Sequence, residues 1–125
     1  MPYEHKIEKH ADYLRVEVHG EREKDKEVED SLAGWKLVTE TCRRENIKKI
    51  LVVLNLTGPF SVLSAYQITQ LAEGINFDRQ FKAAIVDLNR DSIDSNRFGE
   101  VAATNRGYTI KTFDNEDEAI AWLRR

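Results

Sequence analysis

The sequence predicts a single α/β domain, residues 1–125, in which a mixed sheet of five strands packs with four helices. Three observations lead to this fold class. Ile50 to Leu54 is a continuous run of branched apolar residues, typical of a strand covered on both faces. Strand patterns alternate with helical patterns along the rest of the chain, which favours parallel strands. A chain of 125 residues can bury one core without metal or disulfide support.

The opening segment predicts two short strands, at residues 4–10 and 13–19, joined by a tight link. In the second strand apolar and polar residues alternate, which is the pattern of a half-covered strand. The tight link predicts an antiparallel pair at the sheet edge, and the charges on the first strand suit an exposed edge. We expect the hydrophilic run from Gly20 to Lys26 to be a solvated loop.

An amphipathic helix is predicted from Glu27 to about Asn46, because apolar residues recur there at three- and four-residue steps. Its first turn is acidic and its last turn basic, which matches the helix dipole, and Asn46 can end it in a left-handed conformation. Its inner stripe consists of Val28, Leu32, Trp35, Val38 and Cys42. The buried strand follows, and Thr57-Gly58-Pro59 ends it.

The next predicted elements are a helix over Val62 to Ile75 and a strand over Phe81 to Leu88. The helix carries apolar residues around much of its circumference, so we expect it to pack on the sheet. The polar run that leaves the strand, Asn89 to Ser92, is expected at the same end of the sheet as the turn around Thr57.

The last part of the chain predicts helix, strand and helix. Asp94 is the expected cap of a helix that runs to about Asn105. Its expected inner residues are Phe98, Val101 and Ala102. Tyr108 to Phe113 is the last strand, and Asp114 or Asn115 caps a closing helix. The inner residues of the closing helix are Ala119, Ile120 and Leu123. The element order is therefore β-β-α-β-α-β-α-β-α, with the first strand antiparallel to the rest.

Polar residues follow the predicted parallel strands, whose carboxyl ends meet at one edge of the sheet. We call this edge the rim. Its candidate ligand or partner residues are Thr57, Gly58, Ser61 and Ser64 after the buried strand, and Asp87, Asn89, Arg90 and Asp91 after the next strand. Helix N-termini at the rim can hold an anion or a phosphorylated side chain. The same residue types also cap helices and form turns, and that role is the commoner one.

Motifs of catalytic and nucleotide-binding sites are missing from the sequence. It contains no G-x-S-x-G elbow, no Walker loop and no G-x-G-x-x-G, and its histidines, His5, His10 and His19, lie in the opening segment away from the rim serines. No Cys and His residues have metal-ligand spacing, and Cys42 is more simply a core residue than a reactive thiol. We therefore expect no catalytic residues, no metal and no cofactor.

Composition bears on partners and location. Charged residues make up 33% of the chain with a net charge of only -3, and the two signs are interspersed, which disfavours nucleic-acid binding. No apolar run approaches the roughly 18 residues of a membrane span, and the first residues show no signal-peptide pattern. Together with the lone cysteine, this predicts a cytoplasmic protein without membrane insertion.

Two stretches resemble the SpoIIAA-like family, small bacterial domains related to anti-sigma factor antagonists and to the STAS module. The closing segment from Tyr108 to Leu123, with its Phe, acidic cap and Glu-Ala-x-x-Trp-Leu helix, looks like the end of that domain. Ile50 to Tyr66 is similar to the strand and helix start that hold the phosphorylated serine of the antagonists. The resemblance covers nearly the whole chain and implies a SpoIIAA-like sheet with helices packed around it.

The resemblance also implies candidate phosphorylation sites. The antagonist motif resembles Asp-Ser-Ser/Thr-Gly-Leu, and the matching positions here read Leu-Ser-Ala-Tyr-Gln from residue 63. Ser64 matches the phosphorylatable serine, and Ser61 is a second candidate one turn earlier. Leu63 replaces the aspartate and Tyr66 the glycine, so the acidity and close backbone approach of the motif are absent here.

These observations favour a non-catalytic regulatory or binding module that binds a partner protein or a small ligand at the rim. The alternative is a protein whose rim and helix at 62–75 enclose an apolar pocket for a lipid-like molecule. A small enzyme ranks third, because it would need two or more rim side chains that converge on one point. A homodimer through the exposed strand edge or an apolar helix face is a further expectation.

Overall fold

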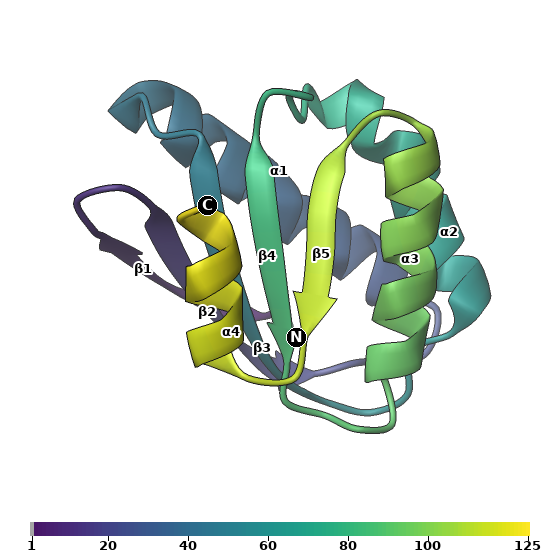
Figure 1. The fold of residues 1–125 in the computed structure, drawn as a ribbon. Helices are drawn as coiled ribbons and strands as arrows, with labels where there is room; N and C mark the ends of the chain where they lie inside the picture. Colours follow the sequence, from purple (N-terminus) through teal and green to yellow (C-terminus); the bar gives the residue numbers. More distant parts are fainter. Residues whose placement is uncertain (1) are drawn as a thin grey trace.

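The computed structural model describes residues 2–125 and places five strands in one sheet, in the order β1-β2-β3-β4-β5 (Figure 1). β1 (Glu4–Lys9) pairs antiparallel with β2 (Leu14–Glu21). β2, β3 (Lys49–Thr57), β4 (Lys82–Asp87) and β5 (Thr109–Phe113) are parallel. The predicted mixed sheet with an antiparallel edge strand is therefore confirmed.

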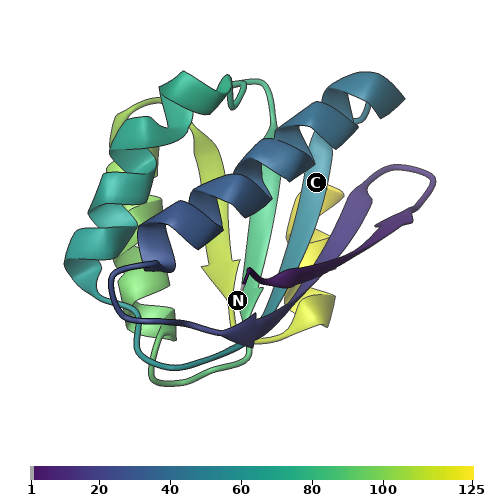
Figure 2. The same cartoon turned by 180° about the vertical axis from the view of Figure 1, so that it is seen from behind.

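Helices cover both faces of this sheet. α1 (Glu27–Glu45) crosses one face, with α2 (Val62–Leu71) and α3 (Ile93–Asn105) beside it, as the view in Figure 2 shows. α4 (Glu116–Leu123) lies on the opposite face, towards the viewer in Figure 1. The helix predicted over residues 62–75 ends in a tighter 3₁₀ turn, η1 (Ala72–Ile75). The predicted number of α-helices is confirmed.

The sheet separates two hydrophobic clusters, which explains the continuous apolar run of β3. Ile50 and Val52 belong to the larger cluster under α1, whereas Leu51 and Val53 belong to the smaller cluster under α4. Successive side chains of a strand point to opposite faces, so a strand with helices on both sides must be apolar throughout. In the smaller cluster the fully buried Leu123 anchors α4 on the sheet.

The ends of α1 and α4 follow the predicted capping pattern. Asn46 ends α1 in the left-handed conformation, with φ 54° and ψ 47°. Asn115 caps α4, because its side chain accepts a 2.9 Å hydrogen bond from the backbone N–H of Glu118. Within residues 2–125, no helix is both long enough and apolar enough to cross a membrane.

The predicted cap of α3 is wrong, and its predicted inner face is right for the buried Ala102 but wrong for Phe98 and Val101. Asp94 lies within the first turn rather than at the cap, and Phe98 and Val101 are 42% and 56% exposed. The buried face of α3 consists of small residues instead, since a Cβ on Gly99 would lie 3.4 Å from the Cβ of Ala65 on α2. Small residues allow the two helices to approach closely, so the larger apolar side chains face outward.

The predicted solvated loop at residues 20–26 is also partly wrong. β2 continues to Glu21, which pairs with Thr57 of β3, and the next residue, Arg22, is only 6% exposed. The backbone N–H of Arg22 donates a 2.9 Å hydrogen bond to the carbonyl oxygen of Thr57, so the parallel pairing carries Arg22 into the protein. A charged side chain is therefore buried at the carboxyl end of β2.

Candidate functional site

The two loops that follow β3 and β4 lie side by side at the rim, as predicted. The side-chain amide of Asn89 donates a 3.2 Å hydrogen bond to the carbonyl oxygen of Leu56, which ties the loop after β4 to the end of β3. The backbone N–H of Leu88 donates another to Leu54, at 3.2 Å. The rim residues of both loops are thus brought into one region.

Asp87 organises the loop after β4. It is 3% exposed and its carboxylate accepts three hydrogen bonds: from the backbone N–H of Asn89 at 2.9 Å, and from the side chains of Ser92 and Asn96 at 2.7 Å each. These contacts connect the end of β4 to the first turns of α3. Asp87 therefore holds the loop in shape, which is the structural role that its residue type already suggested.

Ser61 and Ser64 lie together at the start of α2. The exposed Ser61 caps the helix, because its hydroxyl oxygen accepts a 3.0 Å hydrogen bond from the backbone N–H of Ser64. The two hydroxyl groups are 2.9 Å apart, and Ser64 is only 8% exposed. Of the two serines proposed for phosphorylation, Ser61 is thus the more accessible to another protein.

The remaining predicted residues take turn and backbone roles. Gly58 has φ +91°, and a Cβ there would lie 3.1 Å from the carbonyl oxygen of Arg22, so only glycine fits this close approach. Thr57 accepts the backbone hydrogen bond from Arg22 already described. Arg90 and Asp91 are exposed, and the backbone N–H of Asp91 bonds to the side chain of Asn89 at 2.9 Å.

The predicted rim side chains therefore form two separate hydrogen-bonded groups rather than one converging site. One group is Ser61 with Ser64, and the other is Asp87 with Asn89 and the start of α3. In the part of the chain that the structure describes, no three His, Cys, Asp or Glu side chains are grouped to hold a metal ion.

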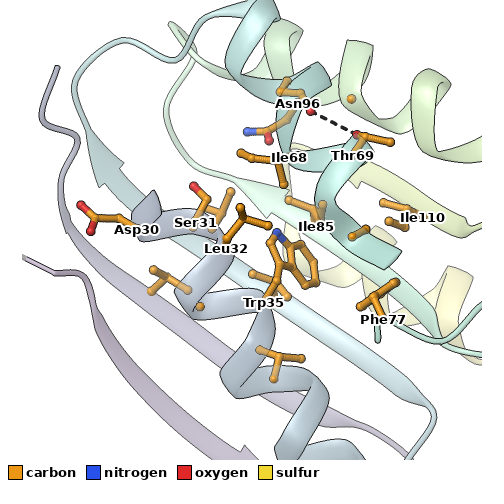
Figure 3. A pocket seen from close by; sticks show the side chains of 18 of the residues that line it. Asp30, Ser31, Leu32, Trp35, Ile68, Thr69, Phe77, Ile85, Asn96 and Ile110 are labelled. Atoms are coloured by element: carbon orange, nitrogen blue, oxygen red, sulfur yellow. Dashed lines mark hydrogen bonds between the residues drawn. The ribbon is translucent and has the colours of Figure 1, made fainter. Parts of the chain in front are cut away.

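Below the rim, a cavity of about 120 Å³ lies between α1, α2, α3 and the sheet (Figure 3). Trp35 of α1 and Ile68 of α2 face each other across it, with Ile85 of β4 and Phe77 beyond them. Trp35 and Phe77 also pack edge to face, with ring centroids 5.4 Å apart. The cavity wall is thus mostly apolar, and one of its components is the tryptophan that the sequence pattern placed on the inner stripe of α1.

Polar groups also contribute to this wall. They include Tyr3, His5 of β1, Arg22 directly after β2, and Asp30 and Ser31 of α1. Thr69 of α2 and Asn96 and Glu100 of α3 are further polar lining residues. Burial raises the pKa of Tyr3, and the nearby Arg22 charge opposes that rise. Among the described residues, the buried Oδ2 atom of Asp30 and the buried hydroxyl of Tyr108, another wall residue, have no hydrogen-bond partner.

Arg22 is the most unusual of these polar groups. Its Nη1 donates a 3.2 Å hydrogen bond to the carbonyl oxygen of Gly58, and its guanidinium carbon lies 4.9 Å from the ring centroid of Phe60. Burial lowers the pKa of Arg22, and the charge of Asp87 partly offsets that effect. No ion pair joins Arg22 and Asp87 among the described residues, so Asp87 can attract this buried cation only beyond ion-pair distance.

Sequence reasoning missed Arg22 because it lies in a run of mixed charges. A usable signal was present: Leu14, Val16 and Val18 are the inward positions of β2, and the same two-residue period reaches Gly20 and Arg22. Extending the strand pattern by two steps would have placed the arginine on the inner face.

No protein-family model matches the chain, and no curated protein is found to be related to it. A solved structure of an uncharacterised protein from Shewanella loihica PV-4, described as a member of the DUF3478 family with a SpoIIAA-like fold, is similar. The two chains are 22% identical, with a TM-score of 0.52, and the match covers 98% of this chain and 94% of the other. This likeness confirms the SpoIIAA-like fold that the closing segment and the centre of the sequence predicted.

Proposed function

We propose that this protein is a non-catalytic binding module that holds a small, mostly apolar ligand in the cavity below the rim. The cavity of about 120 Å³ is the observation that carries this proposal. An apolar cavity of about 150 Å³ in another protein binds benzene, so a group of that size is the natural occupant here.

The size of the cavity limits the ligand. Sites for drug-sized molecules usually enclose about 300–1,000 Å³, which is well above the 120 Å³ found here. A whole lipid would not fit, whereas a benzene-sized compound or one end of a lipid-like chain would. The rim contacts support binding rather than catalysis, since the side chains of Asp87 and Ser61 already hold the loop after β4 and the start of α2.

Tryptophan fluorescence offers a direct test. Trp35 lines the cavity, whereas Trp122 packs in the smaller cluster on the opposite face of the sheet. A Trp122→Phe protein therefore carries a single reporter at the cavity. We expect titration with benzene, toluene or methylcyclohexane to change Trp35 fluorescence in a saturable way.

A cavity-filling variant supplies the control. Thr69 of α2 lines the cavity and is 8% exposed, and its hydroxyl donates a 3.1 Å hydrogen bond to the carbonyl oxygen of Ala65 in the same helix. Thr69→Leu adds apolar volume and should abolish the saturable signal while it leaves the unfolding midpoint equal or higher. The proposal fails if none of the three compounds gives saturation, or if Thr69→Leu leaves the signal intact.

A second candidate function is docking of a partner protein on the outer faces of α2 and α3. These two helices contact each other and expose large apolar side chains. Leu63 of α2 is 65% exposed, and Phe98 and Val101 of α3 are also exposed. Phosphorylation of the exposed Ser61 would add negative charge next to this surface. A photo-crosslinker at position 63 should capture one partner in the native cell that a crosslinker at the exposed Lys36 does not.

A further inference from the structure

We propose that the ligand of the cavity is a small monocarboxylate, with an apolar body inside the cavity and its carboxylate bound by Arg22. This inference rests on the proposed function, because it concerns the same cavity and names the chemical class of its ligand.

Arg22 has unused capacity to bind an anion. A guanidinium group carries five N–H donors, and the hydrogen bond to Gly58 uses one of them. Buried charges in proteins are normally paired, yet within residues 2–125 no carboxylate oxygen lies within the 4.0 Å of an ion pair with Arg22. A nine-tenths buried cation that contributes to a cavity wall is thus left with most of its donors free.

Asp87 does not occupy the free donors of Arg22. Asp87 is the largest influence that stabilises the charged form of Arg22, but its own oxygens accept three hydrogen bonds from Asn89, Ser92 and Asn96. Those contacts direct Asp87 towards α3. Arg22 and Asp87 therefore attract one another at a distance, without the two-point contact that guanidinium and carboxylate groups form when they meet.

The same surroundings restrict the anion to a single charge. Asp87 and Glu27 repel any anion that approaches Arg22, and the unpartnered oxygen of Asp30 adds a negative wall elsewhere in the cavity. Coulomb energy falls with distance, so a carboxylate in direct contact with the guanidinium gains more than it loses to these more distant charges. A second carboxylate on the ligand would have no such partner.

The apolar part of the wall fits the rest of such a molecule. Phe60 packs against the guanidinium, and Trp35, Ile68 and Phe77 form the apolar wall that Figure 3 shows. An aromatic or short branched acid would place its charged end at Arg22 and its body among these side chains. Benzoate is the simplest probe of this class, because its ring is benzene-sized.

Three probes with one ring and different head groups test the inference in the Trp122→Phe protein at pH 7: benzoate, benzyl alcohol and benzylamine. We expect benzoate to bind at least tenfold more tightly than benzyl alcohol. Arg22→Gln should remove that preference and leave benzyl alcohol binding within about twofold. Arg22→Lys keeps the positive charge but loses the paired donors, so it should restore only part of the preference.

The outcomes separate this inference from the proposed function. If benzyl alcohol binds as tightly as benzoate to the unsubstituted site, the carboxylate assignment is overturned while the cavity proposal stands. Tighter binding of benzylamine also overturns it and assigns the head group to Asp30. If none of the three probes binds, and toluene also fails, the cavity proposal itself is wrong. The comparison of head groups needs no substitution at Arg22, so it remains decisive even if Arg22→Gln does not fold.

Discussion

Removal of the Asp87 carboxylate should destabilise the protein substantially, because three donors and one buried cation depend on it. Ser92 is fully buried, so in Asp87→Ala its hydroxyl loses its bond to the carboxylate with no water to replace it. It keeps only the 3.3 Å contact to the carbonyl oxygen of Asn89. Asn96 is half-buried, so water can replace part of its lost bond. An orphaned buried donor costs about 1–3 kcal/mol, and the partial compensation gives a total of about 2–4 kcal/mol.

Urea unfolding measures this loss. The free energy of unfolding of a small domain is about 5–15 kcal/mol, so the predicted change is a large share of it. With a urea dependence of about 2 kcal/mol per molar, the unfolding midpoint should fall by about 1–2 M. Asp91→Asn is the matched control, because Asp91 is an exposed residue of the same loop, and it should change the free energy of unfolding by less than about 0.5 kcal/mol. An Asp87→Ala protein as stable as this control would refute the structural role assigned to Asp87.

Three further predictions concern the core and two titratable groups. Leu123→Ala should lower the free energy of unfolding by about 2–5 kcal/mol, since Leu123 is fully buried under α4, whereas Leu63→Ala should change it by less than about 0.5 kcal/mol in the same urea assay. The hydrogen bond from Arg15 lowers the pKa of Glu116, so this carboxylate stabilises the fold above its unfolded pKa of about 4.3, and the contribution is lost as the pH falls below that value. Glu116→Gln should therefore flatten the dependence of stability on pH below about pH 4.3. Burial raises the pKa of Cys42 to about 11, so a thiol reagent at pH 8 should react with it quickly only after unfolding in urea.

The fold could be predicted because several local patterns agree with one architecture. The run from Ile50 to Leu54 is apolar throughout because its side chains alternate between two buried clusters. Asn46 marks the end of α1 because few residues besides glycine adopt the left-handed conformation readily. The orientation of α3 could not be predicted, since spacing identifies an apolar stripe but not the direction it faces. Its close contact through Gly99 turned Phe98 outward.

The candidate site was less predictable for a different reason. The positions of Thr57 and Asp87 at the rim follow from strand direction, which periodicity reveals. The cavity depends on how completely the side chains of three helices and the sheet fill the space between them, and no local sequence pattern records that volume. Arg22 was missed because the clear alternation of apolar and polar residues stops at His19, whereas β2 continues to Glu21 and carries Arg22 into the protein.

Arg22 also has a structural role, and that role must be separated from ligand binding. Its backbone N–H bonds to Thr57 and its side chain to Gly58, so it fastens the end of β2 to the turn that precedes α2. A lysine can keep the single side-chain bond and the attraction to Asp87, but it cannot form two parallel bonds with a carboxylate. If Arg22 were only structural, Arg22→Lys would leave both stability and the benzoate preference close to their original values. The ligand role instead predicts nearly unchanged stability together with a reduced preference for benzoate. Burial of Arg22 agrees with either role, so this one substitution distinguishes them.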